Sequence, residues 1–208
     1  SPRRTEISES EEIIDDESLI TSEEVVVTFT NTGYIKRVPL NSYRAQRRGG
    51  KGRAGMTTKE EDYVNKVFVV NTLTPLLFFS SLGIVYKLKT YKIPTGSPTS
   101  KGKALVNILP LRSGEKITAT MPYDQSDDKN NIIFATSTGN IRRNRLTDFH
   151  NINANGKIAM KLKESDELVN VIICSEKDNI FMSTKLGKCI RFGCKDLRIF
   201  SGRSSIGV

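Results

Sequence analysis

The chain has 208 residues and a net charge of +9, with 37% hydrophobic residues, 15 glycines and no tryptophan. This composition favours turn-rich β-structure over a helical bundle, and no apolar run approaches the roughly 18 residues that a membrane-spanning helix needs. The basic character points to nucleic acid as the partner. Because neither a secretory signal nor a basic amphipathic helix is visible, we expect a cytoplasmic protein with no membrane partner.

Residues 1–22 are predicted to be an acidic linker or tail. The first 24 residues hold two arginines against nine acidic residues, so residues 25–208 carry 30 cations against 14 acids. The lead-in has too few apolar residues to build a core of its own. We therefore expect the folded domain to span residues 23–208 and to be strongly basic.

A basic, glycine-rich heptapeptide follows the first predicted hairpin. Its residues are Gln46, Arg47, Arg48, Gly49, Gly50, Lys51 and Gly52, and Arg53 comes directly after them. Glycine lets the backbone approach a ligand closely, while arginine and lysine supply positive charge. Such a loop suits an extended polyanion such as a phosphodiester backbone, and a solvated basic loop is the simpler alternative.

The body of the chain repeats one hairpin pattern four times. In each copy an apolar run ends in Ser or Thr, two residues follow, and a glycine closes the turn. The four hairpin glycines are Gly33, Gly83, Gly139 and Gly187. We expect each of them to adopt the left-handed conformation of a tight hairpin. The predicted second strands cover residues 34–38, 84–88, 140–145 and 188–192, and further apolar stretches cover 64–70, 104–109 and 117–121.

A second glycine follows each hairpin glycine at a similar distance, and these four are Gly52, Gly102, Gly156 and Gly202. Each unit then holds about four short strands in roughly 50 residues, a period typical of propeller blades. The sequence therefore predicts an all-β, propeller-like domain with about four blades, one around each hairpin glycine.

Cations recur at two fixed places in these units. Four residues after the hairpin glycines are Arg37, Lys87, Arg143 and Arg191, and directly after the second glycines are Arg53, Lys103, Lys157 and Arg203. Further cations close to them include Lys36, Lys101 and Arg142. In stacked blades these positions would form a basic belt that binds and bends duplex DNA through its phosphates. Ordinary solvated strand edges are the alternative.

No catalytic or metal-binding pattern is visible in the sequence. The Gly-Lys pairs at residues 50–51 and 102–103 lack the spacing of a phosphate-binding P-loop. The three cysteines have no spacing or partner typical of zinc sites, so we expect free thiols. The sequence predicts a non-catalytic chain that needs no cofactor.

The heptapeptide Gln46–Gly52 resembles the GyrA box of the DNA gyrase A-subunit family. Residues 33–40 and 45–52 are similar to the first blade of that family's C-terminal domain, and residues 106–111 and 156–162 are similar to later blades. Residues 1–7 are similar to the end of the family's DNA-breakage domain, where it passes into the linker. The resemblance covers nearly the whole chain.

This resemblance implies a β-pinwheel, a propeller variant in which blades exchange strands with their neighbours. It implies a domain that wraps double-stranded DNA, independently of its sequence, to support ATP-dependent negative supercoiling. The heptapeptide would carry the wrapping function. The breakage domain and gyrase B would be the protein partners, and ATP and Mg²⁺ would belong to other parts of the holoenzyme. Since the family's wheel has six blades, we expect this chain to be a fragment.

Two alternatives remain open. The A subunit of topoisomerase IV has a similar C-terminal domain, although its box is degraded or missing, so the intact heptapeptide favours gyrase. A propeller whose basic rim binds an acidic protein is the other alternative. Its function would be sensitive to changes on a face of the wheel and indifferent to changes in Gln46–Gly52.

Overall fold

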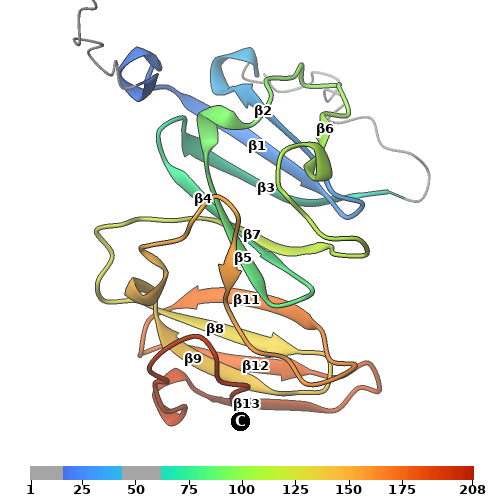
Figure 1. Cartoon of the computed structure of the whole chain (residues 1–208), viewed down its shortest axis with the longest axis vertical. Helices are drawn as coiled ribbons and strands as arrows, with labels where there is room; N and C mark the ends of the chain where they lie inside the picture. The colour runs from blue at the N-terminus through green and yellow to red at the C-terminus, as the bar shows by residue number, and fades with distance from the viewer. Residues whose placement is uncertain (1–15, 44–61) are drawn as a thin grey trace, which may run out of the picture.

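The computed structural model describes residues 16–43 and 62–208. Within these ranges the secondary structure consists of β-strands and short 3-10 turns, with no α-helix. Figure 1 shows the sheets following one another in chain order, from the blue N-terminal sheet to the red C-terminal hairpin. The all-β prediction is confirmed.

The strands of the described residues form four antiparallel sheets. The first has the order β3 (Val64–Asn71), β1 (Glu24–Thr30), β2 (Tyr34–Pro39) and β6 (Lys103–Ala104). The second has the order β7 (Ile117–Pro122), β4 (Pro75–Ser80), β5 (Ile84–Lys89) and β10 (Lys157–Ile158). The third contains β11 (Leu168–Cys174), β8 (Asn131–Thr136) and β9 (Ile141–Arg145). The fourth is the hairpin of β12 (Asn179–Ser183) and β13 (Cys189–Gly193).

A 3-10 turn follows the second strand of every hairpin. These turns are η2 (Leu40–Ser42), η3 (Thr90–Lys92), η5 (Leu146–Phe149) and η6 (Cys194–Asp196). Two further turns are η1 (Asp16–Leu19), before the first strand, and η4 (Leu105–Asn107), after β6. After η3 and η5 the chain continues to β6 and β10, which pair with the preceding sheet.

Each unit after the first contributes a strand to the preceding sheet. β6 belongs to the second unit but pairs with β2, and β10 belongs to the third unit but pairs with β5. Val208 extends the pattern, since its amide and carbonyl exchange hydrogen bonds with Ile141 at 2.9 and 2.7 Å. We call β6, β10 and Val208 the exchange strands. Neighbouring sheets are thereby linked by backbone pairing as well as by side-chain packing.

The four hairpin turns share one hydrogen-bonding scheme. Their glycines have φ between +73° and +89°, which confirms the predicted left-handed conformation. Each glycine amide donates to the carbonyl three residues earlier at 3.0 Å. The hydroxyl of that earlier residue accepts a second bond, at 3.1–3.3 Å, from the amide after the glycine; these residues are Thr30, Ser80, Thr136 and Thr184. This second bond explains why Ser or Thr ends every apolar run.

The first and third hairpin turns are each supported by an aspartate from a distant part of the chain. Asp166 accepts hydrogen bonds from the Thr138 amide at 3.0 Å, the Thr138 hydroxyl at 2.8 Å and the Ser137 hydroxyl at 2.9 Å. Asp62 binds the amide and hydroxyl of Thr32 in the same way. Burial opposes ionisation of Asp166, but these hydrogen bonds outweigh it and hold the pKa of that carboxyl well below its usual range.

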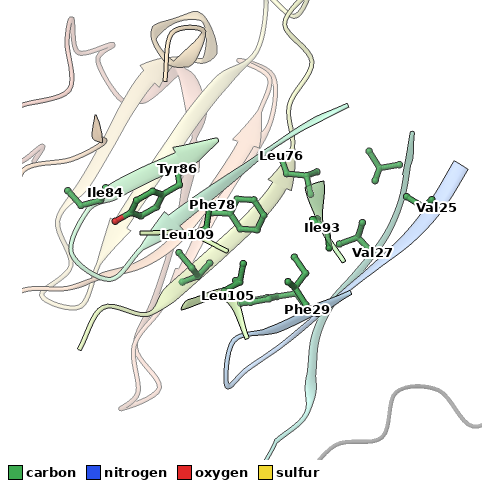
Figure 2. Close-up of a cluster of buried hydrophobic side chains, with 13 residues drawn as sticks. Val25, Val27, Phe29, Leu76, Phe78, Ile84, Tyr86, Ile93, Leu105 and Leu109 are labelled. Atoms are coloured by element: carbon green, nitrogen blue, oxygen red, sulfur yellow. The ribbon is translucent and has the colours of Figure 1, made fainter. Parts of the chain in front are cut away.

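The first hydrophobic core lies between the first and second sheets, as Figure 2 shows. Side chains of β1 and β4 face each other across it, and Leu105 and Leu109 fill the space between them. Residues 104–109, predicted as a strand, are instead the end of β6 followed by η4. The prediction was wrong because a tight turn, closed by the Leu109 amide on the Leu105 carbonyl at 2.8 Å, turns both leucines inward.

The second core repeats this arrangement between the second and third sheets. Phe79 packs edge-to-face against Phe134 and Phe149, with ring centroids 5.6 and 6.0 Å apart. Ala159 and Met160, just after β10, belong to this core, as Leu105 and Leu109, after β6, belong to the first. A residue pair that follows an exchange strand therefore completes each of these two cores.

The third core, between β8–β9 and the last hairpin, is smaller. It contains Ile133, Ile141 and Ile180 together with the free thiols of Cys174 and Cys194. The two sulfur atoms are 3.5 Å apart, and burial together with the Cys194 thiol raises the pKa of Cys174 to about 12. Both thiols act here as small apolar side chains.

The described part of the predicted linker contacts the body of the domain. Glu17 forms an ion pair of 2.7 Å with Lys89, and the Thr72 hydroxyl donates to the Thr21 carbonyl at 2.8 Å. Residues 16–22 are therefore held against the ends of β3 and β5.

Removing the Asp166 carboxylate should destabilise the domain at neutral pH. Asp166→Asn removes the charged acceptor of the turn, whose hydrogen bonds are worth about 1.5–3 kcal/mol. Because the folded pKa lies below the unfolded one, this stabilisation is present at neutral pH and is lost as the pH falls below about 4. Urea denaturation at several pH values measures both effects.

The exposed Asp128 provides the control, since Asp128→Asn removes an equal charge from a loop. The difference between wild type and Asp166→Asn should shrink on acidification. An Asp166→Asn variant as stable as wild type at neutral pH would contradict this account of the turn.

Candidate nucleic-acid interface

The predicted heptapeptide Gln46–Gly52 and Arg53 lie outside the described residues, so their place in the repeat comes from the sequence. Gly52 follows Gly33 at the same distance at which Gly102 follows Gly83. Gly102 ends the segment that connects η3 to β6. The heptapeptide therefore has the same position in its unit as residues 96–102 have in theirs.

We call these connecting segments the exchange bulges, residues 96–102, 150–156 and 200–207. The first bulge begins beside a parallel bridge between Thr95 and Arg37, and it ends at the exchange strand β6. The third begins beside an equivalent bridge on β9 and ends at the last exchange strand. The first and third bulges thus leave the edge of the preceding sheet and return to it, and the second ends at β10, which pairs with the preceding sheet.

The first bulge encloses the side chain of Lys36. Lys36 is only 1% exposed, and its ammonium donates to the carbonyls of Ser97, Pro98 and Ser100 at 3.0, 2.5 and 2.7 Å. Three carbonyls match the three hydrogens of an ammonium group. Burial lowers the pKa of Lys36. A Cβ at Gly102 would clash with the Ile35 carbonyl and crowd the Lys36 side chain.

Arg142 has the same position in the third bulge. It is completely buried, and its guanidinium donates to the carbonyls of Arg203 and Ser205 at 2.8 and 2.7 Å and also to the Ala159 carbonyl. Burial is the main cause that lowers the pKa of Arg142 to about 10, which leaves the group charged at neutral pH. Lys36 and Arg142, expected near a surface belt, are therefore interior residues.

Tyr86 takes the corresponding place in the second bulge. Its ring lies against Gly156, and its hydroxyl donates to the Glu115 carboxylate at 3.0 Å. Burial and then the hydrogen bond to Glu115 raise the pKa of Tyr86 to about 12. The second bulge is therefore built around a neutral aromatic side chain where the other two enclose a cation.

Three of the predicted belt cations bind backbone carbonyls of the next unit. They are Arg37, Lys87 and Arg143, each four residues after a hairpin glycine. Their acceptors lie within or directly after η3, η5 and η6, at 2.7–3.1 Å; these are the carbonyls of Ile93, His150, Cys194 and Leu197. Burial and then the charge of Lys89 lower the pKa of Lys87. These cations therefore connect consecutive units.

Arg143 is the most enclosed of these cations, with 2% exposure. It also forms an ion pair with Glu176, whose side chain is 64% exposed. Solvent screens that ion pair, so the buried carbonyl bonds contribute more to stability. The expected surface position of Arg143 is wrong, because the third and fourth units close around it. Arg191, its counterpart in the fourth unit, is exposed.

The cations predicted after the second glycines have different surroundings. Lys103 is exposed in β6, while Lys157 is half-buried and donates to the Asn151 carbonyl at 2.7 Å. Arg203 is half-buried inside the third bulge. Lys103 begins the exchange strand β6 and Lys157 begins β10, whereas Arg203 begins no exchange strand.

The predicted equivalence of Gly202 with Gly102 is wrong. The glycine that closes the third bulge is Gly207, since Val208 pairs with the third sheet as Lys103 pairs with the first. A Cβ at Gly207 would meet Ile141 and Arg142, as one at Gly102 would meet Ile35 and Lys36, whereas Gly202 has no atom within 4 Å of such a position. Arg203 is therefore not the counterpart of Lys103.

Several cations remain at the surface near the bulges. The Lys101 ammonium lies 3.6 Å from the centre of the Tyr34 ring, and the Arg198 guanidinium lies 4.2 Å from that of Phe200. Such contacts orient a cation while leaving its charge unneutralised. Among residues 16–43 and 62–208, no cluster of His, Cys, Asp and Glu suited to a metal ion is present, and no helix could cross a membrane.

Replacing Arg143 should destabilise the domain far more than replacing Arg191. Arg143→Ala leaves buried carbonyls without donors, and breaking such a buried charged network costs about 3–5 kcal/mol. Arg191→Ala removes the same charge from the surface and should change stability by about 0.5 kcal/mol or less. The free energy of unfolding in urea measures both, and equal effects would refute the assignment of Arg143 as a clamp.

Comparison with known proteins agrees with this architecture. The chain matches the family model of the DNA gyrase C-terminal domain, a β-propeller, over residues 24–71, 74–124, 130–175 and 178–208. It is 51% identical to the DNA gyrase A protein of Rickettsia conorii, over 100% of this chain and 23% of that protein. It is 40% identical to the DNA gyrase A protein of Escherichia coli, over 99% of this chain and 23% of that protein. The chain thus spans about a quarter of the length of these relatives.

Two solved structures share the fold. The C-terminal domain of DNA topoisomerase IV has a TM-score of 0.77 at 25% identity, covering 91% of this chain and 57% of that one. A DNA gyrase A C-terminal domain has a TM-score of 0.66 at 27% identity, covering 89% of this chain and 59% of that one. The predicted β-pinwheel is confirmed. Together with the sequence relatives, this shows that the chain belongs to the family of DNA gyrase A C-terminal domains.

Proposed function

We propose that this chain binds duplex DNA along its basic perimeter and bends it, as the non-catalytic DNA-wrapping domain of a gyrase A protein. The observation that carries this proposal is the large excess of cations in the body of a chain that belongs to the family of gyrase A C-terminal domains. Residues 25–208 hold 30 cations against 14 acids, and duplex DNA carries one negative charge per about 1.7 Å. A domain with this excess of positive charge suits a linear polyanion, and Lys103, Arg191 and Arg198 are exposed cations of the described residues.

Binding of this kind reads phosphates and not bases. In the described ranges no α-helix is present that could enter the major groove. Bending a site of 20–30 base pairs costs about 1–6 kcal/mol, and release of counterions from many phosphate contacts offsets that cost. The affinity should therefore be independent of DNA sequence and should fall steeply with salt.

In this proposal the domain acts inside a larger enzyme in the bacterial cytoplasm, at the nucleoid. The wrapped DNA presents a segment for passage to the breakage domain of gyrase A, with gyrase B as the further partner. ATP and Mg²⁺ serve those other parts, while this chain contributes charge and curvature. The heptapeptide Gln46–Gly52 adds its cations at the position of an exchange bulge.

Neutralising the heptapeptide should abolish wrapping. A nicked plasmid is sealed by ligase in the presence of the chain, and the linking number is measured after the protein is removed. Wild type should shift the linking number, because wrapped DNA is constrained in a chiral path. The triple variant Arg47→Ala, Arg48→Ala and Lys51→Ala should lose the shift.

The control removes the same charge from exposed lysines elsewhere, as Lys66→Ala, Lys116→Ala and Lys129→Ala. This control should keep the shift. A wild-type chain that binds no DNA at low salt would contradict the proposed function. A shift that survives the heptapeptide substitutions would contradict the role of Gln46–Gly52.

A further inference from the structure

The first exchange bulge has an inner and an outer side with different chemistry. On the inner side, the carbonyls of Ser97, Pro98 and Ser100 converge on the buried Lys36 ammonium. The outer side offers hydroxyl groups, because Ser97 and Thr99 are exposed. Acceptors thus face the interior and hydrogen-bond donors face the solvent.

Two lysines complete the outer side. Lys101 lies over the Tyr34 ring, and Lys103 is exposed at the start of β6. Because Lys103 pairs with Ile35 across the sheet edge, its backbone is fixed relative to the first sheet. Two lysines and two hydroxyl groups on residues 97–103 thus supply hydrogen-bond donors that suit a phosphate.

We propose that this bulge is a second phosphodiester-binding site of the domain and that Lys36 is its positioning residue. The proposal rests on the proposed DNA-binding function and extends it to a site outside the heptapeptide. The ligand is the sugar-phosphate backbone of duplex DNA. Lys36 acts through the bulge, since its ammonium is buried and its three donors are already used.

The physical reason is electrostatic as well as geometric. Carbonyl oxygens repel a phosphate, so a bulge with outward carbonyls would be a poor anion site. Lys36 draws three carbonyls inward and holds the backbone in one conformation before any ligand arrives. A preformed loop loses less conformational entropy on binding than a mobile one.

The third bulge supports this reading independently. Arg142 draws the carbonyls of Arg203 and Ser205 inward, as Lys36 does in the first bulge. A buried cation under a bulge therefore occurs twice in the chain, on different sequences and with different side chains. The second bulge, built on Tyr86, contains Asn151, Asn153 and Asn155 and no Lys or Arg, so we expect a weaker phosphate contact there.

Salt-dependent binding to a labelled duplex tests the proposal. Anisotropy titrations of the full chain between about 50 and 200 mM salt give the slope of log affinity against log salt concentration. Lys101→Ala combined with Lys103→Ala should weaken binding and reduce the slope by about 1 for each lysine. Lys66→Ala combined with Lys116→Ala is the matched control at the opposite sheet edges and should leave the slope unchanged.

Two substitutions test the positioning role of Lys36. Lys36→Met keeps the alkyl chain and removes the ammonium, and it should reduce affinity and slope although this ammonium does not reach DNA. Lys36→Arg should restore both, because an arginine already fills this role in the third bulge. Thermal unfolding identifies a variant that fails to fold, and in that case the Lys101 and Lys103 double variant decides.

The outcomes separate this inference from the proposed function. Wild-type binding that depends on Gln46–Gly52, with the Lys101 and Lys103 double variant indistinguishable from the control, would overturn the bulge site and leave the function intact. Absence of any wild-type binding at low salt would overturn both. A folded Lys36→Met variant with wild-type affinity and slope would overturn the positioning role.

Discussion

Backbone carbonyls that leave a sheet edge and become buried need hydrogen-bond donors, and in this domain buried cations supply them. Lys36 and Arg142 fill two exchange bulges, while Arg37, Lys87 and Arg143 bind the carbonyls beside the 3-10 turns. The exchange strands depend on these bonds, because each strand can reach the preceding sheet only if the segment before it is held in place. The residues that follow β6 and β10 then complete the cores between the sheets.

The cations of this domain therefore fall into two groups with different roles. One group is enclosed and fixes the exchange segments and the contact between units. The other is exposed on those same segments and is available to a polyanion. The two groups meet at the first bulge, where Lys36 of β2 is buried and Lys103 of the paired strand β6 is exposed. The first bulge and β6 thus contribute both to the contact between units and to the surface charge of a domain proposed to bind DNA.

The hairpins could be predicted from the sequence because their chemistry is local: a Ser or Thr, two residues and a glycine determine each turn. The all-β class followed from the same repeats. The position of Arg143 could not be predicted, since its burial depends on the distant carbonyls of Cys194 and Leu197, and its offset from a glycine does not distinguish a clamp from a surface charge. Gly207 was missed because another glycine, Gly202, precedes it by five residues and lies at an offset from Gly187 similar to those in the other units. Asp166 lies far from its turn in sequence and was also missed, although Asp62 follows Gly33 at a similar distance.

Lysine acetylation of the full chain, with and without duplex DNA and read by mass spectrometry, tests the division between enclosed and exposed cations most directly. We expect DNA to protect Lys101 and Lys103 and to leave Lys66 and Lys116 as reactive as in the free chain. Lys36 should stay unreactive in both states, because its ammonium is buried among carbonyls. If Lys36 reacts as readily as the surface lysines, or if DNA protects Lys66 and Lys116 as strongly as Lys101 and Lys103, the account is contradicted.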